Sequence, residues 1–224
     1  KGGQIKTFDN VIANPPFGLS GWGAEAFETD QYGRNFWGCP SDSNADFAWI
    51  QHMVKSMAPG NGRMAVVMPQ GVLFRGNEEG RIREKLVKSD LVEAIVTLGD
   101  KLFYGTGLSP CFMILRRLKP AAHSARVLMI DGTKILTAKR AQNILSPEDV
   151  DRLYELYRKY EDIEDFSKVV TIDDIAAKGY DLSPNKYVNY HKEEIRPYAE
   201  VLAEFKAAYE EVLKREAEFE KLIN

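Results

Sequence analysis

Four consecutive residues, Asn14-Pro15-Pro16-Phe17, combine groups that can hold an amino group attached to a flat ring. The side-chain oxygen of Asn14 and a proline carbonyl both accept hydrogen bonds, so together they can bind both N–H bonds of an exocyclic amine. Two successive prolines lack backbone donors and fix φ, which makes this turn rigid. Phe17 offers a flat face on which an extruded base can stack. The tetrapeptide therefore predicts methyl transfer to an amine such as that of adenine, catalysed mainly by geometry.

A short strand is expected to position this corner. Residues 8–13 form an apolar segment that reads as a buried strand ending at the Asn-Pro-Pro turn. The carboxyl end of a strand is where open α/β sheets bind their ligands. The alternative is that two prolines merely end a strand in a rigid turn, which is common by itself but less so with the complete tetrapeptide.

The segments that follow alternate between helix and strand. Apolar residues recur at helical spacing from Asn44 to Pro59, and a second helix is expected between Asn77 and Val87. Segments 63–68 and 91–98 read as buried strands, which predicts an α/β fold with a parallel sheet covered by helices on both faces. The link between segments 111–115 and 126–130 is too short for a helical crossover, so an antiparallel edge is expected there.

Ser146-Pro147-Glu148-Asp149 has the features of a helix start, with a serine cap, a proline in the first position and an acid three residues after the cap.

The charge is distributed unevenly along the chain. The net charge is −3 and the pI is near 5.8, so an autonomous DNA-binding protein is not indicated. Residues 191–224 carry nine Glu against four Lys and two Arg, which leaves the first 190 residues neutral. If the protein acts on DNA, a partner is expected to supply much of the binding.

No apolar run is long enough to span a bilayer, and no secretory signal is recognisable. Cys39 and Cys111 have no metal-ligand or redox spacing and are interpreted as reduced thiols of a cytoplasmic protein.

Segment 18–43 reads as a long loop with four aromatic residues, Trp22, Tyr32, Phe36 and Trp37. Two interpretations of this loop stay open. It is either a loop with its own packed core or a lid over the base or DNA backbone, with Arg34 and Arg75 as phosphate contacts.

The last 34 residues show the clearest periodicity of the chain. Their apolar residues follow spacings of three and four: Ile195, Tyr198, Leu202, Phe205, Tyr209, Val212, Phe219 and Ile223. So narrow a seam on so charged a helix is typical of a coiled-coil arm that binds a partner. The alternative is a helix that folds back onto its own domain.

Together these motifs resemble a known family. The strand with Asn14-Pro15-Pro16-Phe17 is similar to the fourth motif of amino-methyltransferases that act on adenine. Four further stretches resemble the modification (M) subunits of type I restriction–modification systems: Asp46–His52, Val67–Phe74, Phe103–Pro110 and Gly179–Val188. The set, in this order, is much more specific than the tetrapeptide alone.

The resemblance implies site-specific, adenine-N6 DNA methylation with S-adenosylmethionine as the methyl donor. Asn14, Pro15 and Phe17 would hold the flipped adenine, with Pro16 keeping the catalytic turn rigid. The fold would be the C-terminal part of a Rossmann-like methyltransferase sheet, with a catalytic region 1–135, a helical extension 136–190 and a partner-binding helix 191–224. DNA would be the substrate, and a specificity subunit would receive the C-terminal helix. Whether a second modification subunit and a restriction subunit also join is left open.

The chain departs from the family pattern at its start. A strand and a glycine-rich turn for the cofactor are expected, yet only residues 1–7 precede the motif strand. Gly2-Gly3 has no strand before it, and Gly105-Thr106-Gly107 comes too late and leads into a strand. The chain is therefore interpreted as a fragment that lacks the N-terminal cofactor motif. It is expected to bind S-adenosylmethionine weakly or not at all and to be inactive alone.

Two other functions remain under consideration. The Asn-Pro-Pro turn also occurs in enzymes that methylate an RNA base or a protein glutamine amide, although those more often have Tyr after the prolines. A non-catalytic assembly role through residues 191–224 is the third hypothesis. No metal site is indicated, because the three histidines have no ligand-like spacing to cysteines or acids.

Overall fold

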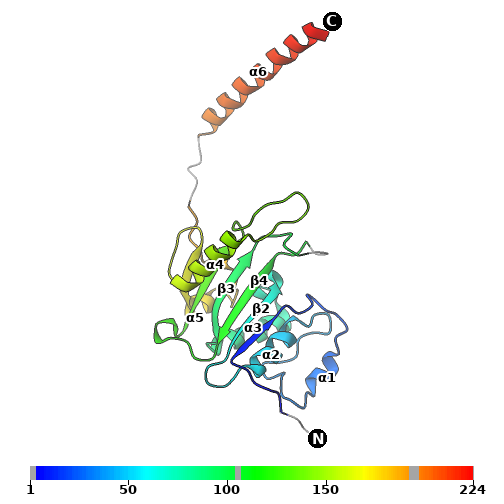
Figure 1. Ribbon diagram of the computed structural model, residues 1–224, viewed down its shortest axis with the longest axis vertical. Helices are drawn as coiled ribbons and strands as arrows, with labels where there is room; N and C mark the ends of the chain where they lie inside the picture. The colour runs from blue at the N-terminus through cyan, green and yellow to red at the C-terminus, as the bar shows by residue number, and fades with distance from the viewer. Residues whose placement is uncertain (1–3, 104–106, 192–196, 224) are drawn as a thin grey trace. The chain divides into compact units, whose positions relative to one another are not determined.

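The computed structural model describes residues 4–103, 107–191 and 197–223. The chain divides into two compact units, Lys1–Tyr190 and His191–Asn224. The first unit is built on a single six-stranded sheet (Figure 1). Its strands in chain order are β1 (Asn10–Ala13), β2 (Arg63–Pro69), β3 (Val92–Leu98), β4 (Pro110–Arg116), β5 (Arg126–Gly132) and β6 (Ser167–Thr171).

The order across the sheet is β1-β2-β4-β3-β5-β6. The pairs β1/β2 and β3/β5 are parallel, whereas β4 is antiparallel to both β2 and β3, and β6 is antiparallel to β5. Four strands therefore run in one direction, and their carboxyl ends share one edge of the sheet. This arrangement confirms the predicted α/β class with an antiparallel edge, but that edge is formed by β6 and not by segments 111–115 and 126–130.

The position of the antiparallel segment 111–115 was predicted incorrectly. It belongs to β4, which lies inside the sheet between β2 and β3 instead of at an edge beside β5. The reason is hydrophobic burial, since Cys111, Met113 and Leu115 are fully buried and Phe112 and Ile114 pack against the opposite face. A strand that is apolar on both faces is most stable in the interior of a sheet.

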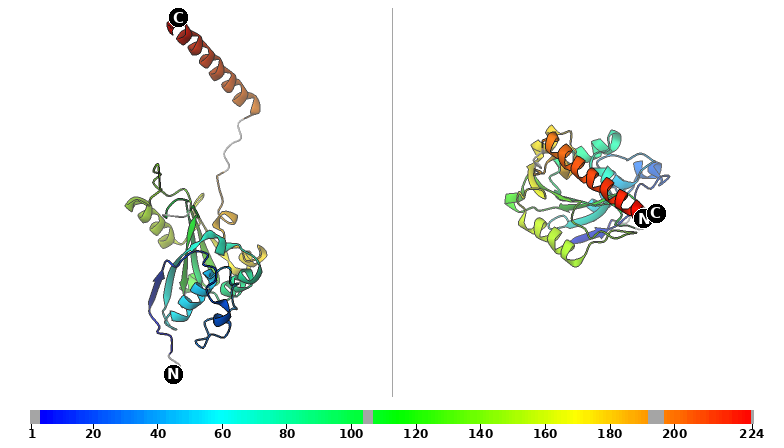
Figure 2. Two further views of the ribbon diagram at one scale, coloured as in Figure 1. Left: turned by 90° about the vertical axis from the view of Figure 1, so that its right-hand side faces the viewer. Right: turned by 90° about the horizontal axis from the view of Figure 1, so that it is seen from above.

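Helices cover both faces of the sheet (Figures 1 and 2). The α-helices of the first unit are α1 (Ala24–Glu28), α2 (Asp46–Ser56), α3 (Asn77–Lys88), α4 (Pro147–Lys159) and α5 (Ile172–Ala177). Three short 3-10 helices are η1 (Gln70–Leu73), η2 (Ala121–His123) and η3 (Pro184–Lys186). One apolar cluster joins the sheet to α2, α3 and α5, and a second joins its other face to α4.

The two central strands show why this arrangement is stable. In β5, Val127 and Met129 belong to the first cluster, whereas Leu128 and Ile130 belong to the second. All seven residues of β3 are buried. Successive side chains of a strand point to opposite faces, so a strand buried along its whole length requires a helix layer on each side.

Two other expectations need correction. The segment that we predicted to be a buried strand has only Asn10–Ala13 in β1, and Ile12 is 82% exposed. β1 is an edge strand, in which Val11 and Ala13 pack against the first apolar cluster while the Ile12 face stays open. The region 136–190 is also not purely helical, because it adds β6 to the sheet as well as α4 and α5.

A local signal correctly predicted the start of α4. At the start of α4, the Ser146 hydroxyl accepts a hydrogen bond from the Asp149 amide (3.2 Å), and the Asp149 carboxylate accepts one from the Ser146 amide (2.8 Å). Pro147 occupies the first helical position, where its missing N–H costs nothing. The expected helix with Phe47 and Ile50 on its buried face is α2.

The second unit contains one helix, α6 (Tyr198–Ile223), of 26 residues. The apolar seam lies along it, and Tyr198, Phe205 and Phe219 are exposed. The Phe205 and Tyr209 rings stack one helical turn apart, with centroids at 6.3 Å. Ile195 lies outside the described residues. None of the helices in the described part of the chain is both long enough and apolar enough to cross a membrane.

Candidate functional site

The corner Asn14-Pro15-Pro16-Phe17 lies at the carboxyl edge of the sheet. β1 ends at Ala13, which pairs with Val66 of the parallel strand β2, so the tetrapeptide leaves the sheet beside the end of β2. Asn14 and Pro16 are exposed, and Pro15 and Phe17 are half-buried. Neither the Asn14 amide nor the Phe17 ring is enclosed in the core, so both remain accessible to a ligand.

A second aromatic ring meets this corner. The rings of Phe17 and Phe103 are in edge-to-face contact, with centroids 6.0 Å apart and planes inclined by 75°. Phe103 belongs to the connection from β3 to β4, which crosses the same edge of the sheet. The two rings are nearly perpendicular and in contact, so they form one continuous aromatic surface beside Asn14. Tyr104–Thr106, and with them most of the Gly105-Thr106-Gly107 segment, lie outside the described residues.

Phe103 was not predicted as a site residue. Its stretch Phe103–Pro110 was noted for its resemblance, but no role was assigned to the ring. The available signal was an aromatic residue just beyond the end of a buried strand, which is where ligand-binding loops of α/β sheets begin.

The chain that leaves the corner is fixed to the start of α2. Gly18 has φ of +58°, a left-handed conformation that favours glycine, and its amide donates to the Asp46 carboxylate (2.9 Å). The next residue, Leu19, accepts a hydrogen bond from the Ala45 amide (3.0 Å). The orientation of the corner thus depends on a helix that begins 28 residues later.

Both arginines that we predicted as phosphate contacts are already paired with carboxylates. Arg34 forms a bidentate pair with Asp30 (2.6 and 3.0 Å), and the Arg34 hydrogen bond lowers the pKa of Asp30. Arg75 contacts Asp46 and Glu79, each at 2.5 Å. Burial alone would lower the pKa of Arg75, but its hydrogen bonds to these two acids raise it. A phosphate would have to share either guanidinium with these acids, and the phosphate contacts stay a prediction.

Segment 18–43 has packing of its own. It contains α1, and its aromatic rings form pairs, Trp22 with Phe27 (5.3 Å) and Phe36 with Trp37 (4.6 Å). Gln51 of α2 holds it through two hydrogen bonds of 2.9 Å, one from the Trp37 amide and one to the Gly38 carbonyl. These contacts are those of a packed loop. Whether the loop also acts as a lid stays open.

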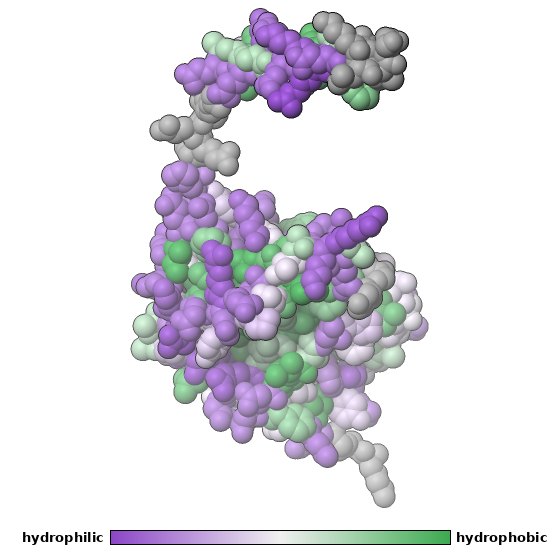
Figure 3. Space-filling model, turned by 45° about the horizontal axis from the view of Figure 1, so that its top comes forward, coloured by the Kyte–Doolittle hydropathy of each residue, from purple (hydrophilic) through white to green (hydrophobic). Residues whose placement is uncertain are grey.

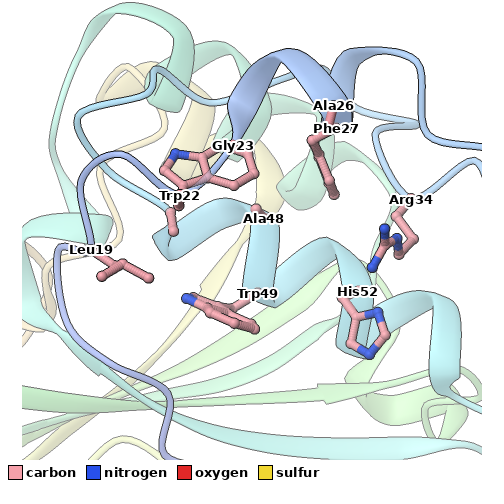
Figure 4. A pocket seen from close by; sticks show the side chains of 10 residues that line it. Leu19, Trp22, Gly23, Ala26, Phe27, Arg34, Ala48, Trp49 and His52 are labelled. Carbon is pink, nitrogen blue, oxygen red and sulfur yellow. The ribbon is translucent and has the colours of Figure 1, made fainter.

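A hollow of about 340 Å³ separates this loop from α2 (Figure 4). Trp22 and Phe27 of the loop line one side, and Trp49 and His52 of α2 line the other. Burial, followed by the nearby Arg34 charge, lowers the pKa of His52 and favours its neutral form. This histidine thus lies on the outer side of α2, away from the apolar cluster that joins the helix to the sheet.

A larger, polar hollow of about 570 Å³ lies at the carboxyl edge of β2, β3 and β5. Its lining includes Gln70, Asp131, Asp181 and Lys186, the last two from the stretch Gly179–Val188. Asp131 accepts hydrogen bonds from the hydroxyls of Thr133 (2.6 Å) and Tyr190 (2.5 Å). Apolar side chains also gather in a recess ringed by hydrophilic ones on the face shown in Figure 3.

Comparison with known proteins gives a consistent result. The family model described as N-6 DNA Methylase matches residues 1–195. The type I restriction enzyme MjaIX methylase subunit of Methanocaldococcus jannaschii is 37% identical over 97% of this chain and 41% of its own length. The HindI methylase subunit of Haemophilus influenzae is 32% identical over 96% of this chain and 50% of its own length. The chain thus spans half or less of these relatives.

A solved structure shares the fold. The type I restriction-modification system methyltransferase subunit from Streptococcus thermophilus superposes with a TM-score of 0.75 at 30% sequence identity. The superposition covers 82% of this chain and 39% of that subunit.

Proposed function

The chain belongs to the N-6 DNA methylase family, and from this premise we propose that the protein methylates adenine N6 in DNA as the modification subunit of a type I restriction–modification system. The observation that carries the proposal is the corner itself. Asn14 lies exposed at the carboxyl edge of the sheet, next to the contacting rings of Phe17 and Phe103. An amide acceptor beside two aromatic faces matches a flat base that bears an amine.

In this mechanism the chain's own residues position the nucleophile. The Asn14 side-chain oxygen and the Pro15 carbonyl each accept a hydrogen bond from one N–H of the adenine amine. This favours a pyramidal nitrogen with an available lone pair. Phe17 stacks on the extruded base, and Phe103 extends this aromatic surface. The nitrogen loses its proton after the methyl group has been transferred, so no strong general base is required.

S-adenosylmethionine supplies the electrophilic methyl group when bound. We assign no cofactor contact to the described residues of this chain. The choice of S-adenosylmethionine as donor is supported by membership of the N-6 DNA methylase family and by the relatives named as type I methylase subunits.

We assign the partner contact to α6. Its apolar seam and exposed Tyr198, Phe205 and Phe219 suit a coiled-coil contact with a specificity subunit, which would also supply DNA affinity that the acidic chain lacks. A second modification subunit and a restriction subunit would join the same complex. Deletion of residues 197–223 should abolish assembly with the specificity subunit while leaving the fold of Lys1–Tyr190 intact, as measured by size-exclusion chromatography and circular dichroism.

Asn14→Ala tests the catalytic proposal in the complete protein that contains this chain. With radiolabelled S-adenosylmethionine and unmethylated DNA, the substitution should remove methyl transfer and leave assembly unchanged. Asn61→Ala, which changes an exposed asparagine in the turn before β2, is the matched control. Retention of activity by Asn14→Ala would contradict the proposed role. Labelling of RNA or of a release-factor glutamine instead of DNA would identify the alternative substrate class.

A further inference from the structure

Three charged side chains, two buried acids and a partly exposed arginine, form a cluster next to the corner. Asp46 is fully buried and Glu79 is 6% exposed, and the Arg75 guanidinium lies between their carboxylates. The guanidinium contacts Asp46 at 2.5 Å and Glu79 at 2.5 and 3.3 Å. This fork-like geometry uses the planar donors that distinguish Arg from Lys.

The cluster is connected to the corner by a single hydrogen bond. One oxygen of the Asp46 carboxylate faces Arg75, and the other accepts the Gly18 amide at 2.9 Å. The Gly18 amide belongs to the Phe17–Gly18 peptide bond, so its orientation determines the direction in which the chain leaves the tetrapeptide. A hydrogen bond to a carboxylate is stronger than one to a neutral acceptor, provided that the carboxylate stays ionised and in place.

Stability alone does not account for this arrangement. A carboxylate in the first turn of α2 is favourable because it faces the positive end of the helix dipole. The arginine and the second acid have no such helix-dipole contribution, and ion pairs, whether exposed or buried, often stabilise a fold little. Their geometric effect is the more informative one, because they hold Asp46 in a single orientation.

Arg75 is itself rigidly supported. The buried Arg83 donates to the Arg75 carbonyl (2.6 Å) and to the Tyr180 carbonyl (2.8 Å). Gly71 lies so close to Arg75 that an added Cβ would meet the guanidinium at 2.3 Å. The segment after β2 is therefore fixed on several sides, and its position is transmitted through Arg75 to Asp46 and Gly18.

We propose that Arg75 is a positioning residue for the base-binding corner, acting through Asp46 on the Gly18 amide and so on Phe17 and Asn14. The inference rests on the proposed function, because it assigns the corner to the target adenine. It replaces a phosphate contact as the main role of Arg75, since the guanidinium is already occupied by two carboxylates. Its consequence is that loss of Arg75 slows the methyl-transfer step more than it weakens DNA binding.

The first test measures the corner directly in the 224-residue chain. Hydrogen exchange of the Gly18 amide, followed by NMR, should become about tenfold faster or more in Arg75→Met, because local opening is no longer opposed. Arg116→Met is a matched control, since Arg116 is 31% exposed, compared with 32% for Arg75, and also pairs with a buried acid, Glu93. Arg116 lies at the opposite end of the sheet and should leave Gly18 exchange unchanged.

The second test uses methylation kinetics of the complete protein. Arg75→Met should lower kcat by about 10- to 100-fold, because a small misplacement of reacting groups has an effect of that size, while KM for DNA changes little. Arg75→Lys retains the positive charge but not the planar guanidinium. Its kcat should lie between that of the wild type and that of Arg75→Met. If Arg75→Met fails to fold, Arg75→Lys and Asp46→Asn supply the same comparison.

The outcomes separate this inference from the proposed function. If Arg75→Met raises KM and reduces the salt dependence of DNA binding while kcat and Gly18 exchange are unchanged, Arg75 contacts phosphate and the positioning role is wrong. If Asn14→Ala abolishes methylation but Arg75→Met affects neither kcat nor Gly18 exchange, only the present inference fails. If Gly18 exchange responds while Asn14→Ala stays fully active, the proposed function fails instead.

Discussion

Replacing Gly71 by Ala should weaken the Arg75 cluster without removing any charged group. A Cβ at Gly71 would lie 2.3 Å from the Arg75 Nη1 atom and 3.1 Å from its Cζ, whereas ordinary van der Waals contact begins at 3.4 Å. The guanidinium must therefore retreat by about 1 Å from its present position. Its ion pairs with Asp46 and Glu79 are already 2.5 Å long and cannot shorten, so the guanidinium has to turn or shift sideways, which lengthens at least one of them.

The size of the effect follows from Coulomb's law. At an effective dielectric constant of about 20, lengthening a pair from 2.5 Å by about 1 Å weakens it by about 2 kcal/mol. Arg75 is 32% exposed, so solvent screening reduces this figure. Alanine also restricts the unfolded chain, which offsets about 0.4–1 kcal/mol where the backbone conformation is compatible. We therefore expect a net loss of about 1 kcal/mol in the free energy of unfolding.

Urea denaturation of the chain measures this loss, and Gly60→Ala is the control. No heavy atom lies within 4 Å of a Cβ built at Gly60, so that substitution should be neutral or slightly stabilising. The difference between the two variants should shrink at high salt, because part of the lost interaction is a partly exposed charge pair. If Gly71→Ala is as stable as Gly60→Ala and its Gly18 amide exchanges at the wild-type rate, the close approach does not constrain Arg75 and the reasoning is refuted.

Three further predictions follow from other contacts. Phe103→Ala should lower affinity for DNA with 2-aminopurine at the target position by about 1–3 kcal/mol, the typical contribution of stacking one base, whereas unchanged fluorescence on binding would show that this ring does not contact the base. The Arg34 hydrogen bond lowers the pKa of Asp30, so the wild type should have a higher free energy of unfolding than Asp30→Asn. This difference should be constant well above pH 3.8 and disappear as the pH falls through the lowered pKa, and a difference that persists in acid would contradict the assignment. Ser146→Ala should cost about 1 kcal/mol in urea denaturation, since it removes the α4 cap, and the exposed Ser20→Ala should cost nothing measurable.

The candidate site could be predicted from the sequence only in part. The tetrapeptide Asn14-Pro15-Pro16-Phe17 is contiguous, so its acceptors, rigidity and aromatic face can be read together. The ring that meets it, Phe103, and the carboxylate that orients it, Asp46, are separated from it by tens of residues. Their approach depends on which strands are neighbours, and this information is spread over the whole sheet.

Local patterns determined the secondary structure well for physical reasons that act within a few residues. The helical spacing of Phe47 and Ile50 and the capping box of Ser146 and Asp149 predicted α2 and the start of α4, because helices are stabilised by contacts one turn apart. The mainly apolar segment 91–98 predicted a strand, and it forms β3.

Tertiary structure alone decided the strand order and the role of the charged residues. The insertion of β4 between β2 and β3 buries an apolar strand on both faces, which no spacing within segment 111–115 could specify. Arg75 was predicted to contact phosphate, yet the fold pairs it with Asp46 and Glu79. Charge pairing depends on distance in space, so its consequences for the corner emerge only when the helices and strands have packed together.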